Sequence, residues 1–185
     1  MAIPFRSSEA AGLGTAAFLR VIPFPEGGGY DGALFVMSAN GEPVEFCFSR
    51  VDTPRTALWR KRDLARRAAV EITRSLVQVC NSSPVLLLAR ADEVGPEVLF
   101  DELGLEIPVC RVASSLAMTA VASTEREQSL GDGELHLFWS GEATMGDEAA
   151  RRLVDRLVAA DLIFEPFERA EAGLLEVRNE AAQQS

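Results

Sequence analysis

The sequence is poor in the residues that most often carry acid–base and metal chemistry. It has one histidine, His136, one lysine, Lys61, and three cysteines among its 185 residues. A site built from several histidines is therefore excluded, and the lysine in WRKRD does not follow the glycine-rich loop of a phosphate-binding Walker sequence. The cysteines, Cys47, Cys80 and Cys110, are far apart in the chain. We interpret them as small buried apolar residues rather than as a disulfide framework or a zinc site.

Long apolar runs are also missing. No stretch approaches the ~18 residues needed to cross a bilayer, and the N-terminal MAIPFRSSEAAGLG lacks the apolar segment of a secretory signal. We therefore expect a cytoplasmic protein. With 48% hydrophobic and 25% charged residues, the chain is typical of a globular protein. We expect a flexible arm at 1–14, one α/β domain at 15–178 with a core at 15–113 and a C-terminal extension at 133–178, and a tail at 179–185.

The net charge of −10 is unevenly distributed. Between Arg50 and Arg74 there are eight basic and three acidic residues, so this segment is locally positive while the rest of the protein is strongly acidic. An acidic body argues against nonspecific coating of nucleic acid, which depends on many phosphate contacts. One basic face remains that could contact an acidic partner or a nucleic-acid backbone.

The stretch GGGYDG at 27–32 has the spacing G-x-G-x-x-G of a dinucleotide-binding loop. Such a loop must lead into a helix, because the pyrophosphate is bound by free N–H groups at the helix N-terminus. Here the following ALFVMSANGEPVEFCFSRV contains Asn40 and Gly41, a strong hairpin signal, between two apolar runs. We therefore predict a connection between strands.

The hydrophobic pattern predicts an α/β fold. Strands are expected at 16–24, 32–38 and 43–51, followed by a long helix in TALWRKRDLARRAAVEITRSLVQVC and a buried strand in VLLLARA. A short helix in GPEVLFDELGL, strands in IPVCRVA and ELHLFWS, a helix from about Asp147 and two extended pieces in LIFEPFERAEAGLLEV complete the prediction. The expected result is a mixed β-sheet, made of an antiparallel three-strand meander and a βαβ unit, flanked by helices.

This order of elements resembles the ribonuclease H-like superfamily over residues 16–113. The resemblance implies carboxylates from the first strand, the first helix, the end of the fourth strand and the last helix, which hold two divalent metal ions. In this sequence it assigns Glu71 to the first helix, Asp92 and Glu93 to the end of the fourth strand, and Asp147 and Glu148 to the last helix.

The first strand, FLRVIPF, has no acid, and the position implied by the resemblance falls at Ile22 or Pro23. We therefore predict a noncatalytic interaction or scaffold subunit with a degenerate ribonuclease H-like fold, part of a nucleic-acid-processing assembly, with no cofactor. It would bind a protein partner, and nucleic acid through the basic face at 50–74. The predicted partner-binding residues are Trp59, Arg60, Lys61, Arg62, Arg66 and Arg67.

Two alternatives remain. The first is a Mg²⁺-dependent nuclease with catalytic Glu71, Asp92 and Asp147, in which Asp92 and Asp147 bind metal and Glu26 or Asp31 replaces the missing ligand. The second is a small-molecule (nucleotide) binding protein that uses the glycine loop at 27–32.

Overall fold

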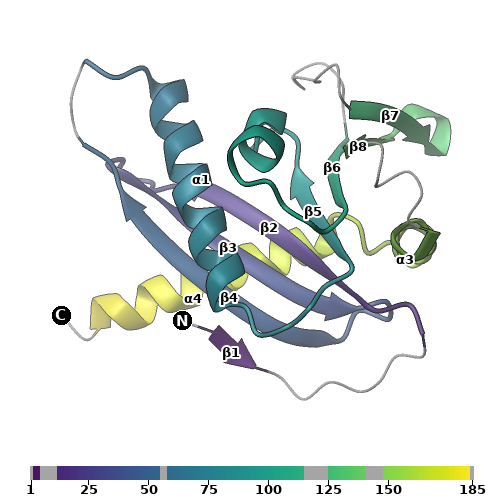
Figure 1. Ribbon diagram of the computed structural model, residues 1–185. Helices are drawn as coiled ribbons and strands as arrows, with labels where there is room; N and C mark the ends of the chain where they lie inside the picture. Colours follow the sequence, from purple (N-terminus) through teal and green to yellow (C-terminus); the bar gives the residue numbers. More distant parts are fainter. Residues whose placement is uncertain (1, 5–11, 55–57, 115–124, 141–147, 184–185) are drawn as a thin grey trace.

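In the part of the chain that the structure describes, eight strands form a single sheet in the order β1-β4-β3-β2-β5-β6-β8-β7. The computed structural model describes residues 2–4, 12–54, 58–114, 125–140 and 148–183 (Figure 1). The strands are β1 (Ala2–Pro4), β2 (Thr15–Pro23), β3 (Gly29–Ser38), β4 (Pro43–Asp52), β5 (Leu86–Arg90), β6 (Val109–Ala113), β7 (Glu125–Leu130) and β8 (Leu135–Ser140).

The sheet is mixed, as predicted. Strands β2, β3 and β4 form the antiparallel meander, and β5 and β6 continue the sheet in parallel with β2. Strands β8 and β7 then add antiparallel pairs. Strand β7 was not predicted, because its sequence EREQSL is polar on most positions and lies in the segment interpreted as a connection.

Helices cover both faces of the sheet (Figure 1). The helical elements are α1 (Lys61–Val79), the π-helix η1 (Val98–Glu102), the 3₁₀-helix η2 (Gly131–Gly133), α3 (Glu148–Ala159) and α4 (Glu165–Gln183). Helix α1 and η1 pack on the face that carries Leu19 and Leu34, whereas α3 and α4 pack on the face that carries Phe18 and Phe35. Neighbouring strand residues therefore enter different cores, as the alternation of side chains along a strand requires.

Helix α1 confirms the predicted amphipathic helix, and one glycine sets how closely it approaches the sheet. Ile72 and Leu76 are fully buried against the strands. A Cβ atom added to Gly32 of β3 would lie only 2.0 Å from Ile72 Cγ2. Gly27 and Gly28, with φ of 73° and 89°, form the turn before β3. The glycine segment therefore connects two strands, as predicted. It also allows the close contact between Gly32 and α1, which was not predicted.

The C-terminal segment is a helix, and the prediction of two extended pieces there is wrong. Helix α4 buries Phe167, Ala170 and Leu174, which recur at helical spacing. The Phe167 ring packs edge-on against Phe18 of β2, with ring centroids 5.2 Å apart. Pro166 lies in the first turn, where a helix tolerates proline.

The ends of the chain add to the sheet and to α4. Strand β1 lies within the predicted N-terminal arm and pairs with β4, and α4 continues into the predicted tail. The division into arm, domain and tail stays a prediction. In the described part of the chain, none of the helices combines the length and the apolar character needed to span a bilayer.

Candidate functional site

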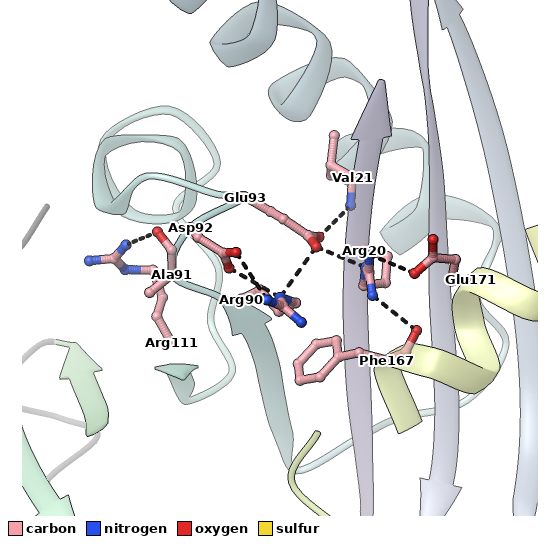
Figure 2. A network of polar contacts seen from close by, with 9 residues as sticks. All are labelled: Arg20, Val21, Arg90, Ala91, Asp92, Glu93, Arg111, Phe167 and Glu171. Carbon is pink, nitrogen blue, oxygen red and sulfur yellow. Dashed lines mark hydrogen bonds and ion pairs between the residues drawn. The ribbon is translucent and has the colours of Figure 1, made fainter. Parts of the chain in front are cut away.

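The carboxyl ends of β2 and β5 bring together the charged residues of the site (Figure 2). The two strands are parallel neighbours, with Leu19 beside Ala89. Arg20 is the next residue of β2, and β5 ends at Arg90. In an open α/β sheet, ligands bind outside the carboxyl ends of the strands. This edge is therefore the expected place for a site.

Arg20 is the centre of the network and is only 6% exposed. Its Nε lies 3.0 Å from Glu93 Oε1, and its Nη2 lies 3.1 Å from Glu171 Oε2 of α4. Its Nη1 donates to the Phe167 carbonyl at 3.3 Å. Within the described residues, no acceptor is aligned for a hydrogen bond with Arg20 Nε, although the Glu93 oxygen is close. The guanidinium thus joins β2 to the loop after β5 and to α4.

Glu93 is the buried acid of the site, with a side chain 13% exposed. It accepts a hydrogen bond from the Val21 N–H at 3.2 Å, and one of its oxygens lies 3.4 Å from Arg90 Nε. Burial raises the pKa of Glu93 to about 7, although Arg20, the Val21 N–H and Arg90 all act to lower it. Glu93 can therefore exchange a proton near neutral pH.

Asp92 has a different environment, because Arg90 neutralises it. Arg90 Nε and Nη2 donate to the two carboxylate oxygens at 3.1 and 3.0 Å. This paired hydrogen bonding lowers the pKa of Asp92, which keeps it ionised. The Asp92 side chain is 51% exposed, so this part of the site is open to solvent.

These residues do not fit a two-metal centre. On the first long strand, the residue beside the acids after β5 is Arg20, not Ile22 or Pro23 as the resemblance implied. Glu93 and Asp92 both contact a guanidinium group, which stays protonated in proteins. A divalent cation among these carboxylates would lie close to a fixed positive charge and be repelled by it.

The other predicted carboxylates that lie among the described residues do not join this group. Glu71 lies on α1, 43% exposed, and pairs with Arg67 at 3.0 Å. Asp31 is buried and pairs with Arg178 of α4, whereas Glu26 is exposed in the β2–β3 turn. Asp147 lies outside the described residues. Glu148, at the start of α3, is exposed.

The predicted basic face is exposed at the start of α1. Arg66 pairs with Glu102 of η1, and Arg67 with Glu71. Lys61 and Trp59 line a cavity of about 440 Å³ together with Pro23 and the glycine turn. The start of α1 therefore lies beside the turn that follows the carboxyl end of β2. The predicted residues Trp59, Arg60, Lys61, Arg62, Arg66 and Arg67 are all exposed.

Sequence reasoning missed Arg20 and Glu171. An arginine in the apolar strand FLRVIPF is a usable signal, because a buried arginine needs an anionic partner. Glu171 had no such signal, because its segment was interpreted as extended and not as a helix that packs on β2. The site therefore depends on α4.

No sequence-family model matches the chain, and neither does any curated protein sequence. The fold does have counterparts among solved structures. The catalytic domain of human endonuclease V superposes with a TM-score of 0.58 at 19% identity, covering 97% of this chain and 91% of that one. Endonuclease V from Streptomyces avermitilis superposes with a TM-score of 0.52 at 14% identity, covering 89% and 83% of the two chains.

These comparisons correct the predicted function. Both neighbours are named as endonucleases, and one is described as a catalytic domain, which contradicts a noncatalytic scaffold subunit and favours the nuclease alternative. At identities of 19% and 14%, the structural similarity shows that the fold is shared. The chain has a mixed-sheet α/β fold of the ribonuclease H-like type, shared with endonuclease V.

Proposed function

We propose that this protein is a nuclease that hydrolyses phosphodiester bonds of nucleic acid at the Arg20–Glu93 pair. The observation that carries the proposal is a buried carboxyl group with a pKa near neutrality, held against a guanidinium at the carboxyl ends of two parallel strands. General acid–base catalysis works best when the pKa of the catalytic group is close to the working pH.

Glu93 acts as the general base. Water attacks phosphorus, its proton passes to the Glu93 carboxylate, and the bond between phosphorus and the leaving oxygen breaks. The leaving oxygen then takes up a proton from solvent, which the open side of the site at Asp92 supplies. The ionised form of Glu93 is the active one in this scheme.

Arg20 and Arg90 supply the positive charge that the phosphate requires. Guanidinium groups bind phosphate oxygens with paired hydrogen bonds and stabilise the charge that develops during attack. Of the two guanidinium groups, Arg90 is the one that solvent reaches, with a side chain 32% exposed, so we expect it to contact the phosphate first. The exposed basic residues at the start of α1 extend this charge for contact with further phosphates.

A cleavage assay tests the proposal. Purified protein is incubated with end-labelled single- and double-stranded DNA and RNA, each in EDTA, in Mg²⁺ and in Mn²⁺. We expect cleavage that persists in EDTA, since Asp92 and Glu93 are both paired with arginine, and that falls at least 100-fold in Glu93→Gln.

Glu168→Gln is the matched control, because Glu168 is an exposed acid on the same helix as Glu171. It should cleave like the wild type. Both variants are first compared by circular dichroism and thermal unfolding. Absence of cleavage on every substrate, or unchanged cleavage by a folded Glu93→Gln variant, would overturn the proposal.

A further inference from the structure

Two cysteines that are 33 positions apart in the sequence meet beside one buried carboxylate. Glu45 and Cys47 lie on β4, two residues apart, so both point toward the face covered by α1. Cys80 is the residue that ends α1. Cys47 is buried and Cys80 is half-buried, and the sequence interpretation did not foresee that the two lie together. Both thiols are free.

The donor atoms of the three residues lie close enough together to share one cation. Cys47 Sγ lies 3.7 Å from Glu45 Oε1, and Cys80 Sγ lies 3.6 Å from Glu45 Oε2. One ligand atom from each of the three residues lies within 4.8 Å of the other two. Zinc bonds of ~2.3 Å to sulfur and ~2.0 Å to oxygen give tetrahedral edges of about 3.5 to 3.8 Å.

The carboxylate is held in place by groups other than the thiols. Glu45 is 2% exposed and accepts hydrogen bonds from the Asn81 and Ser82 N–H groups, at 3.0 and 2.8 Å. The Asn81 amide and the Ser82 hydroxyl also donate to it, at 3.0 and 2.6 Å. Such contacts orient a metal ligand in the way that outer-shell partners do. No basic side chain within the described residues forms an ion pair with Glu45.

A cavity reaches Cys80, one of the two cysteines. A cavity of about 360 Å³ is lined by Cys80, Ser82 and Val77, and Val77 is 41% exposed. The cavity gives a cation access to the Cys80 side of the cluster, and we expect a water molecule as the fourth ligand on that side. Two thiolates, one carboxylate and one water form a donor set that zinc accepts.

We propose that Cys47, Cys80 and Glu45 form a binding site for a soft divalent cation of the zinc class. The site ties the end of α1 to β4, on the face of the sheet opposite α4. Binding replaces the two thiol protons with metal–sulfur bonds and releases those protons to solvent. The site is independent of the Arg20–Glu93 pair, so it can be tested without any nuclease activity.

The experiment titrates the full-length, reduced, metal-free protein with Zn²⁺ and with Co²⁺. We expect about one bound Zn²⁺ per chain by elemental analysis after gel filtration, and thiolate-to-cobalt charge-transfer absorption with Co²⁺. At free zinc ~100 times the dissociation constant, the melting temperature should rise by about 5 to 10 °C.

Cys47→Ser/Cys80→Ser should lose the zinc and the cobalt absorption, whereas Cys110→Ser keeps both, because Cys110 is a buried thiol on the opposite face of the sheet. The wild-type spectra decide the question even if a variant fails to fold. The proposal is overturned if the wild type binds no metal and shows no cobalt–thiolate absorption. It is also overturned if the folded double variant retains full binding, or if the two thiols only form a disulfide.

Discussion

Arg111 and Glu125 form an ion pair that is completely removed from solvent. Arg111 Nε and Nη2 each donate to a different Glu125 carboxylate oxygen at 2.7 Å, and both side chains are 0% exposed. Arg111 Nη1 also donates to the carbonyls of Ala91 and Val94, at 3.3 and 3.1 Å. Figure 2 shows the Ala91 contact, at the start of the loop that presents Glu93. The pair therefore supports both the sheet and the proposed site.

Breaking this pair should strongly destabilise the protein. In Glu125→Gln, the buried Arg111 guanidinium loses the charge of Glu125, and we expect the free energy of unfolding to fall by ~3–5 kcal/mol in urea denaturation. Glu134→Gln, at an exposed position in the turn before β8, should change it by less than ~0.5 kcal/mol. A cost for Glu125→Gln no larger than that of the control would contradict the prediction.

The rate of cleavage should depend on pH through Glu93. Because the ionised carboxylate is the base, activity should be low well below its pKa of about 7 and rise tenfold per pH unit there, levelling off above it. The measurement is a kcat/KM profile from pH 5 to 9. A profile that is flat across pH 7 would contradict the assignment of Glu93 as the base.

Replacing Arg20 should shift the pH dependence of cleavage. Since the Arg20 charge lowers the pKa of Glu93, Arg20→Gln should shift the rising limb of the profile to higher pH. Arg20→Gln should also lower the maximal rate, because one of the positive charges that stabilise the phosphate is removed. Arg152→Gln on α3 is exposed and should leave the limb in place.

Nucleic-acid affinity should depend on the basic start of α1. Lys61→Ala/Arg62→Ala removes two exposed cations, so the slope of log K against log salt on duplex DNA should become shallower by about 1.8. Arg151→Ala/Arg152→Ala removes two exposed cations from α3 and should leave the slope unchanged. Equal slopes for all three proteins, measured by fluorescence anisotropy, would exclude this surface from binding.

Gly32 should tolerate no side chain. Gly32→Ala places a Cβ 2.0 Å from Ile72 Cγ2, so α1 must move, at a cost of about 1–3 kcal/mol in the free energy of unfolding. Gly95→Ala meets only the end of the flexible Glu97 side chain and should cost less. In an Ile72→Ala background, the loss of stability caused by Gly32→Ala should largely vanish. If the free-energy changes of the two substitutions simply add, the contact between position 32 and Ile72 is not the cause of the cost.

The sequence predicts the framework of the fold better than it predicts the site. The meander, α1, β5 and β6 follow from apolar periodicity, which is strong where a strand or helix face is buried. Helix α4 was missed because Pro166 and Gly173 resemble breaks, although Gly173 is required by contact with the Phe46 ring. The pairing of Arg20 with Glu93 could not be found from periodicity, because it depends on which strands are neighbours.

Strand β1 has a consequence for the solution behaviour of the protein. Its three residues pair with Glu45, Phe46 and Cys47 of β4, whose other neighbour is β3. Without β1, this stretch of backbone would form a free edge, with N–H and C=O groups ready to template a strand from a second molecule. A protein shortened by its first few residues would therefore be prone to edge-to-edge self-association, even with its core unchanged.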